Sequence, residues 1–185
     1  STQVLSSAAS DVYNRQAKCI GLEPHNWVTA WVAITDSNEH NGCMRMWSGS
    51  HKDNLKMHNQ MFNEGNLLTR GQTVKNVPIE KTTPLILRAG QMSLHHPTVV
   101  HGSDLNKSSD RRIGFVIQSY IGTNVKQVLG KNGVQLARGK DNYNFHETIE
   151  RPKSLMDKND IKIKKKENDN LQEIFYKGSS KKGNY

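Results

Sequence analysis

The chain contains little cysteine and no long hydrophobic run. The two cysteines among its 185 residues, Cys19 and Cys43, form no CxxC pair. We therefore expect two reduced, buried thiols in a cytoplasmic protein rather than a disulfide framework or a zinc ribbon. No stretch of 18 apolar residues occurs, which excludes a membrane-spanning helix. The first residues show no basic segment followed by an apolar one, so we expect no signal peptide and no membrane association.

Acidic residues are scarce relative to basic ones. The sequence has 26 Lys and Arg against 17 Asp and Glu, a formal charge of +9. Residues 151–185 hold ten basic and five acidic side chains, a net of +5, so over half of the excess lies there. The run KIKKK at residues 162–166 comes without a recognition-helix motif, zinc-finger spacing or a platform of aromatic residues. This pattern indicates a solvated, Lys-rich helix face, and we expect no nucleic-acid partner.

The remaining composition is typical of a globular protein, with 34% hydrophobic and 23% charged residues. Short runs rich in β-branched and aromatic residues alternate with turn signals such as Asn41-Gly42. Many short strands joined by turns favour a β-sandwich or barrel with flanking helices. The predicted strands are residues 27–34, 43–47, 84–87 and 92–96, a strand that opens at His101, and residues 113–121. Gly114 inside the last strand indicates either a bulge or a close backbone approach.

The predicted domain organisation has three parts. Residues 1–150 form one β domain, in which residues 52–83 are a polar insertion or lid with a short helix near residues 55–62. Residues 151–177 form a helical C-terminal extension, which we expect to pack on the β domain through Leu171, Ile174 and Phe175. Residues 178–185 are expected to be a disordered tail.

One group of residues suggests chemistry. His101 lies on a predicted strand, where an imidazole nitrogen can bind a metal ion. Ser103 lies two residues further along and therefore faces the same side of the strand. Arg112 opens the next strand, and its planar guanidinium suits a carboxylate group. The three residues together favour a site for a small oxo acid beside iron, with Asn106 and Ser108 in the connecting loop.

The same spacing has a simpler interpretation. His101 would then be a surface histidine, and Arg112 would pair with Asp104 or Asp110. The other histidines are expected to have structural roles. His95 and His96 precede the strand of His101, so one of them should face the cavity and the other solvent. The spacing alone leaves both interpretations open.

The motifs resemble those of the phytanoyl-CoA dioxygenase family of iron(II)- and 2-oxoglutarate-dependent oxygenases. The similarity lies in AGQMSLHH at residues 89–96, in HGSDLNKS at residues 101–108 and in RRIG at residues 111–114. It extends to residues 27–36, to NGCM at 41–44, to GSH at 49–51, and to residues 133–141 and 174–178. The resemblance implies a mainly β fold with a double-stranded β-helix core (a jelly roll, cupin-like), flanking helices and a C-terminal helix. It also implies that family members carry a further stretch before the part represented here.

The family resemblance assigns roles to individual residues. It makes His101 the distal iron ligand, and it makes Arg112, assisted by Ser103, the group that holds the far carboxylate of 2-oxoglutarate. The family's other two ligands form an HxD motif on an earlier strand. By alignment, Asn14 and Gln16 occupy those two positions. A neutral amide oxygen is a weaker donor for iron(II) than imidazole or carboxylate, so the resemblance implies an incomplete iron triad.

A second HxD lies at His51 and Asp53. Combined with His101 it would give three ligands, but the family's GSH turn, in which His51 lies, does not bind iron. We therefore treat His51 and Asp53 as the less favoured alternative ligands and expect His51 to make a turn hydrogen bond. No catalytic residue beyond the metal site is predicted.

The leading functional hypothesis is a non-haem iron(II)- and 2-oxoglutarate-dependent oxygenase that hydroxylates a small organic substrate. The alternative is a catalytically impaired relative that binds a small carboxylate or a partner, because Asn14 and Gln16 replace the HxD ligands. The implied cofactors are Fe(II) and 2-oxoglutarate. The expected partner is a small-molecule substrate. A homo-oligomer is a further expectation, since it would cover an apolar sheet face.

Overall fold

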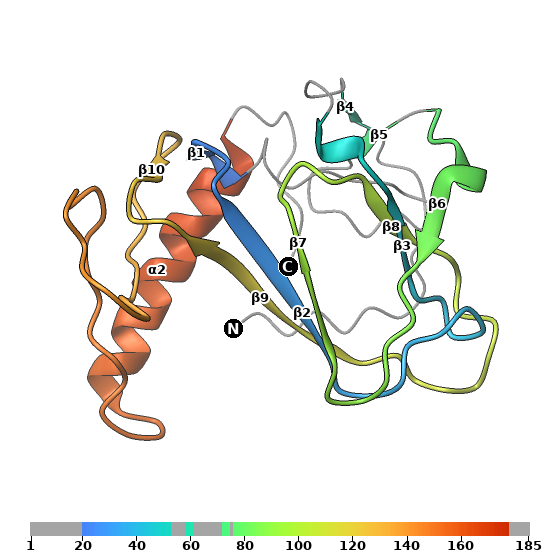
Figure 1. Ribbon diagram of the computed structural model, residues 1–185. Helices are drawn as coiled ribbons and strands as arrows, with labels where there is room; N and C mark the ends of the chain where they lie inside the picture. Colours follow the sequence, from blue (N-terminus) through green and yellow to red (C-terminus); the bar gives the residue numbers. More distant parts are fainter. Residues whose placement is uncertain (1–19, 53–57, 61–71, 75, 178–185) are drawn as a thin grey trace. The chain divides into compact units, whose positions relative to one another are not determined.

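A computed structural model of the chain describes residues 20–52, 58–60, 72–74 and 76–177 (Figure 1). Two compact units are present. In the described part, unit 1 comprises residues 27–120, and unit 2 comprises residues 20–26 and 121–177. The domain boundary expected at residue 150 stays a prediction, and the tail expected at residues 178–185 lies outside the described residues.

The first sheet of unit 1 contains the strand with the two tryptophans. Its order is β7 (Met92–His95), β2 (Trp27–Ala33) and β9 (Gly114–Ile121). The β2 sequence WVTAWVA alternates, and its odd-numbered residues, including Trp27, Thr29 and Trp31, are all buried. In the antiparallel β2–β7 pair, Thr29 lies opposite His95, and Trp31 lies opposite Ser93. These four side chains therefore share one face of the sheet.

The second sheet of unit 1 contains the predicted histidine. Its order is β6 (Thr82–Pro84), β3 (Met44–Trp47) and β8 (His101–Ser103), all antiparallel. Met46 lies opposite His101, and Met44 lies opposite Ser103. Val100, which is completely buried immediately before β8, packs with Val74, Trp47 and Val77. This small core fixes the start of β8 and thus the position of His101.

The predicted insertion differs from expectation where it is described. Residues 58–60, expected within a helix, form β4 (His58–Gln60), which pairs with β5 (Gln72–Val74). The backbone groups are thus satisfied by an antiparallel ladder rather than within a helical turn. A 3-10 helix, η2 (Ile79–Lys81), then leads into β6. The strand expected at residues 84–87 is also shifted, because β6 covers Thr82–Pro84 and beyond it Leu87 makes only an isolated bridge to Ser37.

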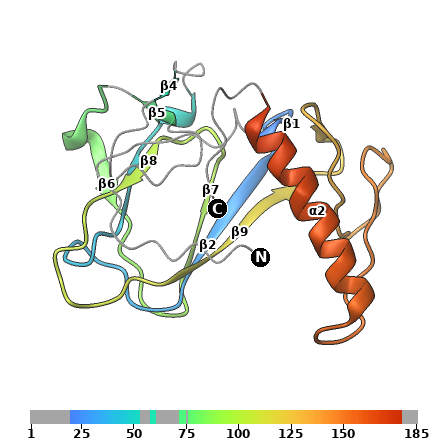
Figure 2. The ribbon, with the colours of Figure 1, turned by 180° about the vertical axis from the view of Figure 1, so that it is seen from behind.

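Unit 2 contains a long C-terminal α-helix. Helix α2 (Lys158–Tyr176) begins at the cap residue Asp157, whose side chain accepts hydrogen bonds from two backbone N–H groups. The side chain of Glu167 accepts a hydrogen bond of 2.6 Å from the backbone N–H of Gly133. Ile174 is buried near Gly130, whereas Leu171 and Phe175 are half-buried. Figure 2 shows the helix alongside the loops of this unit. The predicted docking on the β domain stays a prediction.

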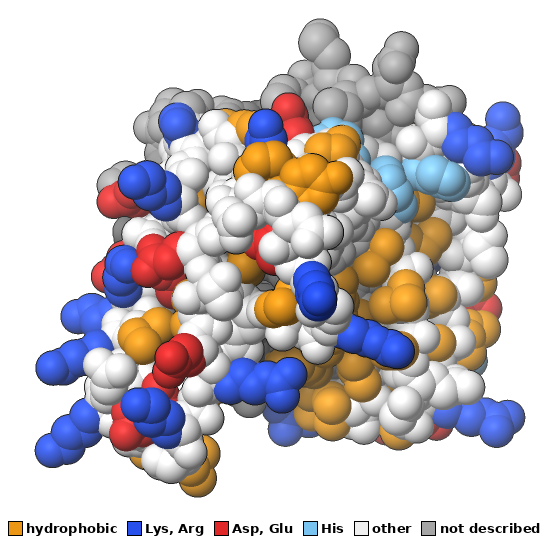
Figure 3. All heavy atoms as spheres, turned by 60° about the vertical axis from the view of Figure 1, so that its left-hand side comes forward, with side chains coloured by type: hydrophobic (Ala, Val, Ile, Leu, Met, Phe, Trp, Pro, Cys, Tyr) orange, Lys and Arg blue, Asp and Glu red, His pale blue; other side chains and the backbone are white. Residues whose placement is uncertain are grey.

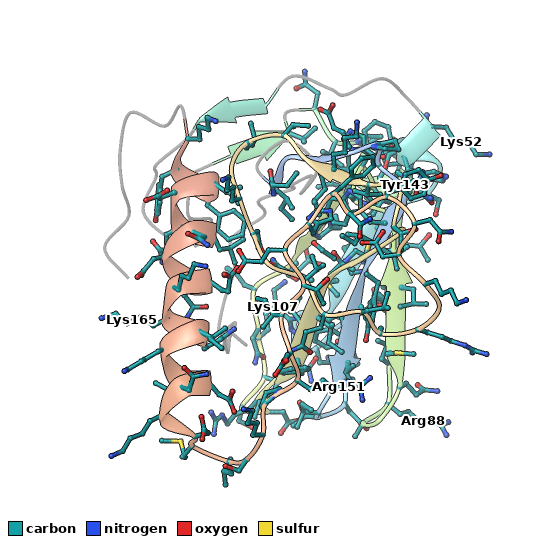
Figure 4. All side chains as sticks on the ribbon, turned by 90° about the vertical axis from the view of Figure 1, so that its left-hand side faces the viewer. Lys52, Arg88, Lys107, Tyr143, Arg151 and Lys165 are labelled. Carbon is teal, nitrogen blue, oxygen red and sulfur yellow. The ribbon has the colours of Figure 1, made fainter. Side chains whose placement is uncertain are left out.

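The remaining elements of unit 2 are short. Strand β1 (Leu22–Glu23) pairs with β10 (Lys126–Gln127). On α2, Lys165 points away from the neighbouring loops (Figure 4). Basic and acidic side chains are interspersed on the surface visible in Figure 3. Within the described ranges, no helix is both long and apolar enough to cross a membrane.

Gly114 lies at a close approach between β9 and β2. A Cβ atom at this position would overlap the indole ring of Trp31. This contact confirms the close approach expected from a glycine inside an apolar strand. The Trp31 indole can occupy this position only because residue 114 has no side chain.

We expect Gly114→Ala to lower the free energy of unfolding by about 2 kcal/mol, within the range for overpacked cores, because Trp31 must move. Urea denaturation followed by circular dichroism would measure the change. Gln118→Ala, at an exposed position of the same strand, is the control and should change stability by less than about 0.5 kcal/mol. An equal effect of the two substitutions would contradict the predicted packing.

Candidate functional site

His101 is held by contacts of the backbone that precedes it. The backbone N–H of Val100 donates to Ser50 Oγ at 2.8 Å, and the Val100 carbonyl accepts from the N–H of Trp47 at 2.9 Å. The Nδ1 atom of His101 lies 3.1 Å from the carbonyl oxygen of Val99. Since a carbonyl oxygen only accepts, Nδ1 carries the proton and Nε2 keeps its lone pair. Histidines that bind metal ions commonly have this arrangement.

Burial also favours the metal-binding form of His101. The side chain is half-buried, and desolvation lowers its pKa below the usual 6.5. The imidazole is thus neutral at pH 7. A neutral ring with a free Nε2 is the form that binds a metal ion.

Arg112 has a buried guanidinium group. The residue is 7% exposed, and its Cζ atom lies 5.9 Å from the centroid of the Trp31 ring. Burial lowers its pKa, although the Cys43 thiol acts in the opposite direction. No ion pair or hydrogen bond of its side chain is found within the described ranges. The pairing of Arg112 with Asp104 or Asp110, expected in the simpler interpretation, is therefore not found among the described residues.

Thr35 fixes the backbone on both sides of Arg112. Its hydroxyl donates to the carbonyl oxygen of Arg111 at 2.8 Å and accepts from the N–H of Ile113, also at 2.8 Å. The N–H groups of Ile34 and Thr35 also donate to the carbonyl oxygen of Ile113. One hydroxyl thus clamps the two peptide groups that flank Arg112. Sequence reasoning missed this residue, and a lone threonine after a strand gives no signal of its partner 76 residues away.

The loop between Ser103 and Arg112 is organised by Asn106. Its Oδ1 atom accepts hydrogen bonds from the N–H and the hydroxyl of Ser108, and its Nδ2 donates to the carbonyl oxygen of Asp110. Ser103 is half-buried, and no partner for its hydroxyl is found among the described residues. The loop therefore returns the chain from Ser103 to Arg112 in a defined conformation.

His95 lies beside His101. The two ring centroids are 5.4 Å apart, and burial together with the neighbouring His101 lowers the pKa of His95 to about 4. The adjacent His96 is engaged elsewhere, because its Nδ1 lies 2.8 Å from Thr98 Oγ1. His95 is thus the one of the two whose ring faces His101.

The alternative ligand His51 does not lie with His101. Its side chain is exposed, and its ring centroid lies 5.6 Å from that of His96. Its carbonyl oxygen accepts a hydrogen bond from Thr98 Oγ1 at 3.2 Å. This bond joins residues 47 apart in the sequence, so it is not the turn hydrogen bond expected of His51, which stays a prediction. Asp53, Asn14 and Gln16 lie outside the described residues, so their roles stay predictions.

The described residues fit a carboxylate better than they fit a complete iron centre. Arg112 is a buried cation without a paired anion in the described part of the chain, and a bound carboxylate would supply one. His101 offers one suitable nitrogen for iron. Across residues 20–52, 58–60, 72–74 and 76–177, however, no group of three His, Cys, Asp or Glu side chains is arranged to hold a metal ion. Further iron ligands would have to come from elsewhere in the chain.

Comparisons with known proteins identify sequences that are similar to this chain. The sequence model described as "Phytanoyl-CoA dioxygenase (PhyH)" matches residues 11–114. The peroxisomal phytanoyl-CoA dioxygenase of Homo sapiens is 30% identical over 86 residues, which are 46% of this chain and 25% of that protein. The chain thus spans about a quarter of the length of the curated relatives that it matches.

Solved structures show the same architecture. The apo form of ThoJ, a non-haem monooxygenase, matches with a TM-score of 0.80 and 26% identity, covering 95% of this chain and 64% of that one. Its nickel complex matches with a TM-score of 0.71 and 25% identity, covering 95% and 62%. The epimerase SnoN, in complex with Fe3+ and alpha-ketoglutarate, shares the fold with a TM-score of 0.51 and 19% identity, covering 68% and 47%. These matches confirm the predicted jelly-roll class.

Proposed function

Because the chain belongs to the phytanoyl-CoA dioxygenase family, we propose that it acts as a non-haem iron(II)- and 2-oxoglutarate-dependent oxygenase that hydroxylates a small organic substrate. The observation that carries the proposal is the buried guanidinium of Arg112, which has no ion-pair or hydrogen-bond partner among the described residues and lies in unit 1 together with His101. A buried cation without an anion is costly to the fold, which favours a role in binding.

In the proposed complex, Arg112 holds the far carboxylate of 2-oxoglutarate through two parallel N–H donors, and the Ser103 hydroxyl adds a third hydrogen bond. Thr35 prevents the backbone of Arg112 from shifting, so the carboxylate is held at a fixed position. His101 presents Nε2 for iron(II). When bound, iron(II) supplies the activation of dioxygen that couples decarboxylation of the oxo acid to hydroxylation.

A second candidate function follows from the ligand positions. Asn14 and Gln16 occupy the aligned HxD positions, and no group of three metal ligands occurs in the described part of the chain. A catalytically impaired relative would keep the carboxylate site at Arg112 and Ser103 but would not turn over.

Anaerobic titration with iron(II) and 2-oxoglutarate distinguishes the two functions. An oxygenase should develop a weak visible charge-transfer band, and after oxygen is admitted it should convert 2-oxoglutarate to succinate. Calorimetric binding of 2-oxoglutarate without the band, without metal retention and without succinate would overturn the oxygenase and support the impaired relative. Absence of 2-oxoglutarate binding would overturn the oxygenase, and it would also exclude 2-oxoglutarate as the carboxylate that an impaired relative binds.

A further inference from the structure

Strand β7 carries two buried polar atoms that the site described above does not use. Ser93 Oγ and His95 Nδ1 are both inaccessible to solvent, and neither atom has a hydrogen-bond partner among the residues that the structure describes. His95 as a residue is only 9% exposed. Buried polar groups are nearly always hydrogen-bonded, because an unpaired one loses its hydrogen bonds to water without replacement. Two such groups on one strand therefore require an explanation.

Both side chains are on the face of the first sheet that carries the predicted site. They are two residues apart on β7, so they project to the same side. Ser93 lies opposite Trp31, whose ring lies beneath the Arg112 guanidinium. His95 lies against the ring of His101. The strand thus has one unpaired polar group at the Arg112 end and one at the His101 end.

The spacing of the two groups suits a short diacid. Residues i and i+2 of a strand are separated by about 6.7 Å. A five-carbon dicarboxylate measures about 5 Å between its carboxyl carbons, because it spans four bonds of about 1.5 Å in zigzag. Such a molecule can reach both groups, whereas a three-carbon monocarboxylate can reach only one.

We propose that Ser93 and His95 are co-substrate-binding residues that complete the oxo-acid site. Ser93 donates to the far carboxylate beside Arg112, and His95 donates a ring N–H to the 2-oxo acid end beside His101. The ligand is a 2-oxo dicarboxylate of about five carbons. This inference rests on the proposed binding of 2-oxoglutarate.

The test measures calorimetric binding of 2-oxoglutarate and pyruvate in the same anaerobic buffer with iron(II). Pyruvate has the 2-oxo acid end but lacks the far carboxylate. Ser93→Ala should weaken the binding of 2-oxoglutarate by about tenfold and leave the binding of pyruvate unchanged. His95→Leu should weaken the binding of both ligands by about tenfold or more. His96→Leu is the matched control and should leave both affinities unchanged.

Two conservative variants separate binding from a structural role. His95→Asn and His95→Gln place an amide N–H near the positions of Nδ1 and Nε2, so one of them should restore most of the affinity. Thermal unfolding of each variant establishes that it is folded. The inference is overturned if wild type binds 2-oxoglutarate and depends on Arg112 but Ser93→Ala has no effect or weakens both ligands equally. It is also overturned if neither amide variant restores binding. If wild type binds neither ligand, the proposed function fails as well.

Discussion

Replacing Arg112 with leucine is expected to weaken 2-oxoglutarate binding by about a hundredfold. Truncating one partner of a buried, hydrogen-bonded charge pair costs about 2–5 kcal/mol, and a hundredfold loss corresponds to about 2.7 kcal/mol. Arg112→Lys should recover only part of the affinity, because a lysine ammonium cannot make two parallel hydrogen bonds to a carboxylate. Calorimetry at constant salt would measure the series.

The stability of the same variant distinguishes binding from folding. Arg112 is buried without a paired anion among the described residues, so exchanging it for leucine should not destabilise the protein and is expected to be neutral or stabilising. Arg111→Leu is the matched control, since Arg111 is exposed and adjacent in the sequence. If Arg111→Leu weakens binding as much as Arg112→Leu, general charge rather than a specific clamp explains the affinity.

Restoring both aligned ligands, by Asn14→His together with Gln16→Asp, is expected to raise iron(II) affinity by at least about a hundredfold. Loss of an outer partner of a metal ligand alone typically costs 10–100-fold, and two inner ligands contribute more. Turnover of 2-oxoglutarate to succinate should rise in parallel. Anaerobic competition with a chelator of known affinity would measure the affinity for iron(II), and chromatography would measure the amount of succinate formed.

A pair of amide-for-amide substitutions is the control for this restoration. Asn14→Gln with Gln16→Asn changes the same two positions but adds neither imidazole nor carboxylate, so iron affinity should stay at the wild-type level. No gain from the His and Asp variant would mean that residues 14 and 16 are not the ligand positions. The alignment, rather than the chemistry of Arg112, would then be at fault.

The sequence predicted those parts of the fold that depend on local patterns. The alternation in residues 27–34 and the apolar run at 113–121 identified β2 and β9, because one buried face imposes a period of two. Helix α2 lies within the helical extension predicted for residues 151–177, where apolar residues such as Leu171 and Ile174 recur among charged ones. The helix predicted at residues 58–60 was wrong because this polar segment has no hydrophobic period. Only its pairing with residues 72–74 makes it a strand.

The candidate site was predictable only where function requires a rare residue type at a fixed spacing. His101, Ser103 and Arg112 were named from their types and positions, and the structure places them on or beside β8 and β9. The clamp by Thr35 and the position of His95 were not predictable. Each depends on strand register, which brings together residues that are distant in sequence or separated by a turn.

The indole beneath Arg112 has an optical consequence. Trp31 emission depends on the electric field at its ring, and a full positive charge lies 5.9 Å from the ring centroid. When an anion neutralises that charge, the emission maximum should shift. Trp31 is thus a built-in fluorophore for the carboxylate end of the pocket, and it reports occupancy whether or not any metal is bound or any product is formed.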